Sequence, residues 1–544
     1  MAPEKPDGIT LGLERITRFL EQVLPADPRA QLRVVHVAGT NGKGSVCALV
    51  STALIAAGYR VGTFNSPHFL EPNDAVRLQG VPIPKDEYQR LRQWIEELDT
   101  QALAEHGRLS QFEQTTALAL WWFAQSSVDI AVVEVGLGGQ RDATNVFGAA
   151  DGQRGVGRSL VQCICPVDED HLGLIGNNVE EIAREKAGIM RPGSWIVIAN
   201  QDRSEAFHKI RQVAHRVSPG RIINVRRQPT YDIHVPNFAI AEVPARLRAP
   251  LALPSWATFN GTGKRCLRAK YPASLDAYIK SNHARRASDE ADTETTERVE
   301  VDLPLELPGY YQAGNASVAF YALDVLRTQF GFTQLTDAAI QVGFQNVRWP
   351  GRLSWLRIAA SGQSSGTSSP GSGSGSEGRT EQLNGWVLAD GAHNEPAAVE
   401  LRKYVDTTLR RVSQQRYIRG TLSRQAQGAL QVRWVVGFSR GKDVAALLAR
   451  LVQAGDVVWA VPFAQPQEMP WISCEQPEAI AEAVQKLGMD GVAVEVFGAL
   501  GEAVDRLAGD QLDGYLNVIC GSLYLVSDVY RVLQVEPFPA DPEL

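Results

Sequence analysis

A glycine-rich segment, GTNGKGS at 39–45, follows an apolar run at 32–38 and precedes a helical pattern. In such a strand–turn–helix arrangement, backbone N–H groups and the positive end of the helix dipole can bind phosphate oxygens. Lys43 adds a full positive charge at the same place. Because Gly44 separates Lys43 from Ser45, the segment departs from the common G-x-x-x-x-G-K-[ST] pattern. The segment predicts a phosphate-binding loop, with a purely structural glycine turn as the alternative.

Apolar runs typical of buried strands alternate with helical periodicity through the first half of the chain. We expect strands at 129–135 and 195–199, and helices at 45–57, 113–125 and 179–190. Short strands that alternate with helices are typical of a parallel sheet covered on both faces. The first half is therefore predicted to be an α/β domain.

The alternation returns after Trp386, and a further strand is expected at 354–358. The segments typical of strands are WVLAD, VRWVVGF, DVVWAVPF, VAVEVF and YLNVIC. Helices are expected between them, for example at 443–454 and 477–487. These segments predict a second, Rossmann-like α/β domain with a sheet of its own.

Two stretches of biased composition interrupt the pattern. Residues 200–300 are less regular and end in a polar run, so we expect a polar insertion there. Residues 359–382 are mainly Gly and Ser, which is typical of a flexible loop. We predict a phosphate-binding domain at 1–350, which contains the insertion, and a second domain at 351–544, which contains the loop.

Charge and composition exclude some classes of partner. The formal net charge is −7, whereas a nucleic-acid-binding surface is usually basic. The chain has no apolar run of the roughly 20 residues that cross a bilayer, and its first residues show no signal or transit pattern. We therefore expect a soluble, cytoplasmic protein without nucleic-acid or membrane partners, with a mitochondrial pool as an alternative.

Polar residues follow several of the predicted strands. Glu134 ends a buried run at the edge where open α/β sheets bind ligands, and its oxygens suit Mg²⁺. The alternative is a hydrogen-bonded glutamate at a strand end. Asp390 can likewise meet a cation or ribose hydroxyls, or form a turn and helix cap. The acidic run 168–171 and Lys186 are, by themselves, typical of a solvated loop and a helix surface.

Seven motifs occur in a fixed order: GTNGKGS, SPH at 66–68, EVGLGG, DEDHLGLIG, EKAGI, WPGRL and DGAHN. Together they resemble the folylpolyglutamate synthase and dihydrofolate synthase branch of the Mur-type ligases. The resemblance runs from about Leu11 to Leu533, apart from the two biased stretches. It implies an N-terminal P-loop ATPase domain of the Mur-ligase type, with a parallel-rich sheet, and a C-terminal Rossmann-like ligase domain that binds glutamate.

The resemblance also implies a mechanism. ATP phosphorylates a substrate carboxylate, and the amine of L-glutamate attacks the acyl phosphate, while the protein mainly positions the reactants and neutralises charge. The implied catalytic residues are Lys43, Glu134, His171, Lys186 and His393. The implied ATP contacts, in a cleft completed by domain closure, are Asn41, Gly42, Lys43, Gly44, Ser45, Asn315, Arg352 and Asp390.

Cofactor and substrate contacts are implied in the same way. One or two Mg²⁺ ions would be held by Ser66, Glu134 and His171, and a need for a monovalent cation such as K⁺ is left open. Lys186 would be carbamylated and so become an anion. The pterin contacts would be Ser110, Gln111, Phe112, Glu113, Arg141, Asp142 and Ala143. Among these, Phe112 offers an aromatic face, and Asp142 an acceptor for the amino-pyrimidine edge.

Two related reactions occur in this family: addition of the first glutamate to dihydropteroate, and extension of reduced folates. The opening LGLERITRFLE at 11–21, Tyr311-Gln312 and the segment 520–525 resemble fungal dihydrofolate synthases, although Ala75 stands where many members have arginine. We predict a monomeric dihydrofolate synthase that forms dihydrofolate, ADP and phosphate from 7,8-dihydropteroate, L-glutamate and ATP. The alternatives are a folylpolyglutamate synthase or bifunctional enzyme and, more remotely, a non-catalytic nucleotide-binding scaffold.

Overall fold

The computed structural model describes residues 12–24, 32–149, 156–225, 266–272, 298–358, 386–410, 431–509 and 515–538. The chain divides into two compact units. Unit 1 consists of the described parts of Met1–Pro236 and Lys264–Trp349, together with Phe538; unit 2 consists of the described parts of Pro350–Pro537. The Gly/Ser tract expected at 359–382 lies outside the described residues.

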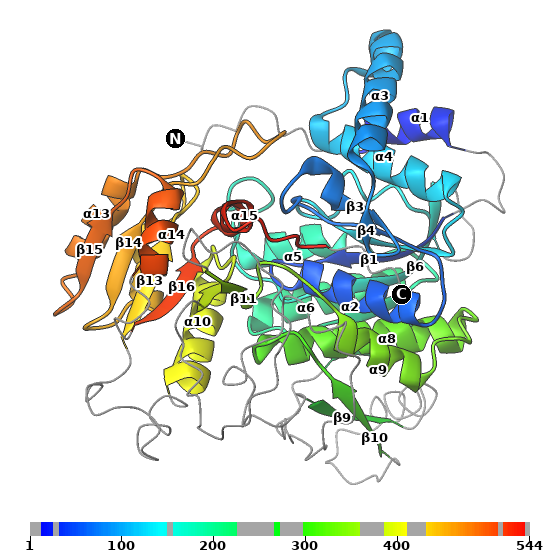
Figure 1. Cartoon of the computed structure of the whole chain (residues 1–544). Coiled ribbons are helices and arrows are strands. Elements are labelled where there is room, and N and C mark those ends of the chain that lie inside the picture. Colours follow the sequence, from blue (N-terminus) through cyan, green and yellow to red (C-terminus); the bar gives the residue numbers. More distant parts are fainter. Residues whose placement is uncertain are drawn as a thin grey trace, which may run out of the picture. The chain divides into compact units, whose positions relative to one another are not determined.

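Unit 1 is built on an eight-stranded sheet in the order β4-β3-β2-β5-β1-β6-β7-β8 (Figure 1). The strands are β1 Leu32–Ala38, β2 Val61–Phe64, β3 Val76–Leu78, β4 Val81–Pro82, β5 Ile130–Glu134, β6 Gly157–Ile164, β7 Trp195–Ile198 and β8 Ile222–Asn224. From β2 to β8 neighbouring strands are parallel, whereas β3 and β4 form an antiparallel edge. The apolar run at 32–38 lies at the centre, where a strand is buried on both faces.

Helices cover both faces of this sheet, as the sequence pattern predicts (Figure 1). On one face, α2 Lys43–Ala56 packs against α8 Tyr311–Gln329 and α9 Asp337–Asn346, around Val35 and Val37 of β1. Val34 points to the opposite face. The helices of that face are α1 Glu14–Val23, α3 Lys85–His106, α4 Gln111–Gln125, α5 Val179–Ala187 and α6 Ser204–Val217.

Regular structure extends into the region where an irregular insertion was expected. Helix α6 forms because Ala206, Ile210 and Ala214 recur at helical spacing and are buried, and β8 then adds an edge strand to the sheet. Farther along, β9 Cys266–Pro272 and β10 Arg298–Pro304 pair antiparallel over their whole length. Residues 226–265 and 273–297 lie outside the described part of the chain.

Unit 2 has a six-stranded sheet in the order β11-β12-β16-β13-β14-β15. The strands are β11 Ser354–Arg357, β12 Trp386–Ala389, β13 Val432–Val436, β14 Val457–Ala460, β15 Ala493–Val496 and β16 Leu516–Cys520. The helices are α10 Glu395–Tyr404, α12 Val444–Leu451, α13 Pro477–Lys486, α14 Leu500–Gly509 and α15 Leu523–Val532. All strands but β11 are parallel, which confirms a Rossmann-like α/β domain. Of the described helices in either unit, none is long and apolar enough to cross a bilayer.

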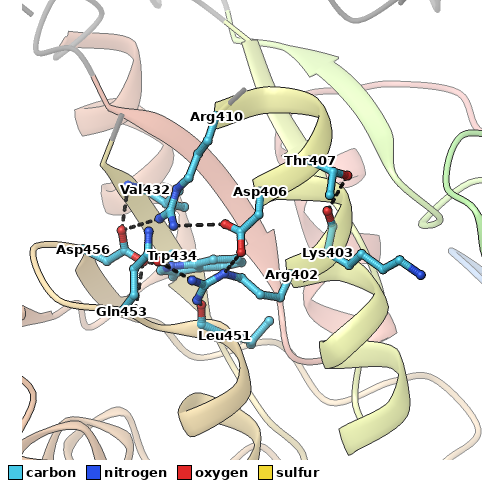
Figure 2. A network of polar contacts seen from close by, with 10 residues as sticks. All are labelled: Arg402, Lys403, Asp406, Thr407, Arg410, Val432, Trp434, Leu451, Gln453 and Asp456. Carbon is cyan, nitrogen blue, oxygen red and sulfur yellow. Dashed lines mark hydrogen bonds and ion pairs between the residues drawn. The ribbon is translucent and has the colours of Figure 1, made fainter. Parts of the chain in front are cut away.

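A buried ion network lies where β13 and β14 begin (Figure 2). The Arg410 guanidinium is 2.7 Å from Asp456 Oδ1 and 3.1 Å from Asp406 Oδ1. Asp456 Oδ2 also accepts a hydrogen bond from Trp434 Nε1 at 2.9 Å, and Arg402 donates to Asp406 at 2.8 Å. The network thus ties the π-helical turn Val405–Arg410 to the sheet. Because open parallel sheets bind ligands at the carboxyl ends of their strands, we assign this network to stability.

Candidate functional site

The glycine-rich segment forms the turn between β1 and α2. Gly39 and Gly42 have φ angles of 150° and 93°, in the region that favours glycine. A Cβ atom on Gly39 would lie 2.5 Å from Cβ of Cys165, and one on Gly42 would lie 2.4 Å from Oδ1 of Asn315. Space and backbone conformation therefore both require glycine at these positions. The structure brings the loop together with Asn315, at the start of α8.

Helix α8 holds the first turn of α2 from the side. Gln312 Nε2 donates to Ser45 Oγ at 3.2 Å, and Asn315 Nδ2 donates to Gln312 Oε1 at 2.8 Å. Trp349 lies against the same turn, because a Cβ atom on Gly44 would come within 2.5 Å of its ring. The backbone of the predicted phosphate loop is thus fixed before any ligand arrives, which lowers the cost of binding.

Lys43 and Glu134 face each other at the carboxyl ends of β1 and β5. The Lys43 Nζ atom lies 3.9 Å from Glu134 Oε1 and donates to the Thr40 carbonyl at 3.3 Å. Their side chains are only 17% and 6% exposed. In this poorly hydrated place, the ammonium group can attract phosphate oxygens strongly, and the carboxylate can hold a cation.

The surroundings of Glu134 fit a hard cation. Asn65 Nδ2 donates to Glu134 Oε2 at 2.8 Å, and the next residue, Ser66, has a buried hydroxyl oxygen without a hydrogen-bond partner. A buried unpartnered oxygen beside a carboxylate is suited to Mg²⁺, which takes oxygen ligands. In the part of the chain that the structure describes, no three His, Cys, Asp or Glu side chains gather in a way that could hold a metal.

His171 lies in the loop between β6 and α5. Its backbone φ is 52°, its Nε2 atom is 3.6 Å from Asp170 Oδ2, and its side chain is 46% exposed. The acidic run around it is attached to the phosphate loop, because Thr40 Oγ1 donates to the Asp168 carbonyl at 3.1 Å and accepts from the Asp168 backbone N–H. The loop that carries His171 is therefore anchored to the turn that carries Lys43.

Lys186 is buried on α5 and points at the phosphate loop. Its Nζ atom donates to the Gly39 carbonyl at 2.9 Å. Burial, and then the neighbouring charge of Lys43, lower the pKa of Lys186 to about 7, against the opposite effect of Asp170. A large share of this amine is therefore neutral at neutral pH, which an ordinary lysine amine is not.

The residues expected to bind a pterin divide into two kinds. Ser110 and Glu113 form the capping box that begins α4, and Glu113 also pairs with Arg15 at 3.0 Å. In contrast, Gln111 has a buried side-chain oxygen without a hydrogen-bond partner. Phe112 stacks on Phe64 with 6.0 Å between ring centroids. The first two residues hold the helix, and the next two offer polar and aromatic contacts.

The residues after the GLGG turn, which were expected to bind the pterin, make contacts with other protein groups. Asp142 is buried and accepts from Leu137 N at 2.7 Å and from Thr144 Oγ1 at 2.5 Å, while burial raises its pKa. Arg141 is 47% exposed and pairs with Glu185 at 3.3 Å. Ala143 is 6% exposed. Asp142 therefore shapes this loop with its carboxylate, instead of offering both oxygens to a ligand.

Sequence reasoning missed Asn65, Gln312 and Arg77. The first two stand beside recognised residues, directly before SPH and one helical turn before Asn315, so their positions were the available signal. Arg77 is buried on β3 and donates to Asn65 Oδ1 and, at 2.8 Å, to the Asp74 carbonyl. Arg77 lies two residues after Ala75, the position at which many members of the family have arginine.

Unit 2 brings together the other predicted nucleotide contacts. Asp390 is buried and accepts from the backbone N–H of Leu353 at 2.8 Å; burial raises its pKa, and Arg352 lowers it. Arg352 lies over Gly391, where a Cβ atom would come within 2.6 Å of its NH1. His393 Nδ1 is 2.9 Å from the Gly391 carbonyl. Residues 350–353 of the WPGRL motif and the DGAHN motif therefore form one cluster within this unit.

Comparison with known proteins gives full-length similarity to two fungal enzymes. The family described as "Dihydrofolate synthetase, C-terminal domain" matches residues 378–532. The probable dihydrofolate synthetase of Schizosaccharomyces pombe is 28% identical over 533 residues, which cover 97% of this chain and 99% of the relative. The dihydrofolate synthetase of Saccharomyces cerevisiae is 28% identical over 529 residues, which cover 96% and 98%.

Solved structures share the fold over nearly the whole chain. Folylpolyglutamate synthase of Mycobacterium tuberculosis, complexed with ADP and AMPPCP, gives a TM-score of 0.64 at 23% identity and covers 97% of this chain and 96% of its own. A bifunctional folylpolyglutamate synthase/dihydrofolate synthase with Mn, AMPPNP and L-glutamate bound gives 0.61 at 25% identity, with 97% and 95% covered. The similarity in fold therefore includes both units.

Proposed function

Because this chain belongs to the folylpolyglutamate synthase and dihydrofolate synthase family, we propose that it is an ATP-dependent dihydrofolate synthase. It joins L-glutamate to 7,8-dihydropteroate and releases dihydrofolate, ADP and phosphate. The observation that carries this choice is the match of nearly the whole chain to two fungal dihydrofolate synthetases. Several bacterial relatives are named dihydrofolate synthase/folylpolyglutamate synthase, so a bifunctional enzyme is the second candidate.

In the proposed reaction, unit 1 carries the phosphoryl transfer. A carboxylate oxygen of dihydropteroate attacks the γ-phosphorus of ATP, and ADP leaves; the glutamate amine then attacks the acyl carbon, loses a proton, and phosphate leaves. Backbone N–H groups of Gly42–Ser45 bind phosphate oxygens, and Lys43 neutralises charge that grows on them. Ser66 and Glu134 would hold Mg²⁺, which would screen the phosphate charges and polarise the γ-phosphoryl group. His171 is proposed as a further metal ligand.

Lys186 is suited to the carbamylation that the family resemblance implies. Its lowered pKa leaves a neutral amine, whose nitrogen can attack the carbon of CO₂ and then lose a proton. The product is an anion buried beside the Gly39 carbonyl and near Lys43, whose positive charge would stabilise it. We propose that this anion helps to hold the metal, and mass spectrometry of the protein kept in bicarbonate would detect the added mass.

For the substrates, we propose a narrower set of contacts than the sequence suggested. Gln111 and Phe112 would contact the pterin, because one offers a buried free acceptor and the other an aromatic face. Ser110, Glu113 and Asp142 would shape the pocket through their own hydrogen bonds. In unit 2, Arg352 and Asp390 would contact the nucleotide, and His393 the glutamate or the transferred phosphate. A monomeric state, a cytoplasmic location and a need for K⁺ stay predictions.

Phosphate release by the purified protein tests this function. The assay contains ATP, Mg²⁺ and L-glutamate, with dihydropteroate in one reaction and tetrahydrofolate in a parallel one. We expect release that depends on dihydropteroate. Release only with tetrahydrofolate would identify a folylpolyglutamate synthase, and release with both a bifunctional enzyme. Tight ATP binding without release in either reaction would instead support the non-catalytic scaffold.

A further inference from the structure

An aromatic cage encloses the guanidinium of Arg77 in unit 1. The Arg77 Cζ atom lies 4.6 Å from the ring centroid of Phe538 and 5.2 Å from that of Trp349. Phe538 in turn lies 6.3 Å from Trp349 and 6.5 Å from Phe69, measured between ring centroids. Because Arg77 is only 5% exposed, these rings replace much of the water that would otherwise surround its charge.

Two hydrogen bonds in series connect Arg77 to Glu134, the predicted metal ligand. Arg77 donates to Asn65 Oδ1, and Asn65 Nδ2 donates to Glu134 Oε2 at 2.8 Å. A guanidinium has only donors, so it requires the oxygen of the Asn65 amide on its own side. The NH₂ group must then face Glu134. If Arg77 moved, the amide would lose the contact that fixes its orientation, and a turned amide would place oxygen against the carboxylate.

Phe538 comes from a different part of the chain than the rest of the cage. The chain up to Pro537 belongs to unit 2, and at Phe538 it rejoins unit 1. Trp349, the other ring beside the Arg77 guanidinium, also touches the first turn of α2 at Gly44. The cage is therefore continuous with both parts of the site in unit 1, the phosphate loop and the carboxylate, and Phe538 completes it from the C-terminal end of the described chain.

We propose that Phe538 is a positioning residue that sets the affinity of the site for Mg²⁺. Its ring holds the guanidinium plane of Arg77, Arg77 fixes the Asn65 amide, and Asn65 orients the carboxylate of Glu134. Residues that orient metal ligands through hydrogen bonds usually change metal affinity by ten- to a hundredfold, and Phe538 acts one contact farther away. The proposal rests on the proposed function only in that Glu134 binds the magnesium of a nucleotide complex.

Two truncations that differ by one residue give the sharpest test. One chain ends at Phe538 and the other at Pro537, so that only the second lacks the ring. Calorimetric titration with ADP, in the presence and absence of Mg²⁺, measures binding without any turnover. We expect about three- to tenfold weaker Mg²⁺-dependent binding in the chain that ends at Pro537, with unchanged binding of ADP alone. The chain that ends at Phe538 should bind like the full protein.

Point variants separate the ring from its apolar volume. Phe538→Leu keeps an apolar side chain but removes the aromatic face, whereas Phe538→Tyr keeps the face. Leucine should reproduce the loss of Mg²⁺-dependent binding and raise the Mg²⁺ concentration for half-maximal phosphate release, with little change in kcat at saturating Mg²⁺; tyrosine should restore both. The proposal would be overturned if the variants weaken ADP binding equally with and without Mg²⁺, or do not weaken it at all. Because the calorimetric titration needs no turnover, this result would count even if the protein proved inactive with every pterin.

Discussion

Lys43 is the residue on which the proposed phosphoryl transfer depends most directly. Lys43→Ala should lower the rate of phosphate release by about a hundredfold or more, because it removes a buried charge that stabilises the transferring group. It also removes the ammonium group that lies 3.9 Å from Glu134 Oε1. Lys85→Ala is the matched control, since Lys85 is 65% exposed and pairs with Glu71. A Lys43→Ala protein that keeps the rate of the control would refute the phosphate-loop assignment.

His36 is a residue at which we expect an effect on the stability of the fold and not on catalysis. It is buried on β1, its Nε2 atom lies 2.9 Å from Thr144 Oγ1, and its ring packs edge-on against Phe147. Burial, and then the charge of Arg191, lower the pKa of His36 to about 3. In the unfolded chain the pKa is about 6.5. Between these values the unfolded chain binds the extra proton, so this contribution to stability is complete above about pH 6.5 and falls as pH drops toward 3.

Replacement of this histidine should therefore change the pH dependence of unfolding. His36→Gln removes the proton uptake, so the slope of the unfolding free energy between about pH 6.5 and 4 should decrease by up to about 1.4 kcal/mol per pH unit. Denaturant unfolding at a series of pH values measures this slope, and His208→Gln on the exposed side of α6 is the control. An unchanged slope in His36→Gln would mean that His36 is protonated in the folded protein.

At the scale of elements, charged and capping contacts decide where helices begin and how they attach to the sheets. Asn178, Asn394 and Ser522 begin α5, α10 and α15 by accepting backbone N–H groups, a signal that the sequence displays. The ion network at the start of β13 and β14 has no such local signal. Arg410 and Asp456 are 46 residues apart in the chain and meet only because the π-helical turn packs there.

The ion network predicts a large effect on stability from one substitution. Asp456→Asn should destabilise the protein by about 3–5 kcal/mol, because the Arg410 guanidinium would lose its buried carboxylate partner and keep only Asp406, whose side chain is 40% exposed. Glu495→Gln breaks an ion pair with Arg506 that is nearly half exposed, and it should cost less than about 1 kcal/mol. Denaturant unfolding of both variants checks the difference. Similar, small losses would mean that the buried pair is well compensated by other contacts.

At the scale of the whole molecule, the sequence pattern predicts both sheets but not every feature of the two units. Both sheets follow from apolar runs that alternate with helical periodicity, since a strand buried on both faces must be apolar almost throughout. The return of the chain to unit 1 at Phe538 has no counterpart in the pattern. Neither has the antiparallel edge of β3 and β4, because short strands carry few residues in which a period can be recognised.

The sequence by itself determined the α/β class, the glycine-rich turn between a strand and a helix, and the family, because these depend on local patterns: a strand, a glycine turn, a helix and motifs in order. It also placed Glu134 at the end of its strand and Lys43 in the turn that leads into a helix. Only the tertiary structure decided that the Asp142 carboxylate accepts hydrogen bonds within its own loop and that burial lowers the pKa of Lys186. It also decided that Arg77, which packs on Phe538, is linked to Glu134 through Asn65. Burial and long-range contacts arise from packing between distant segments, and no local pattern records them.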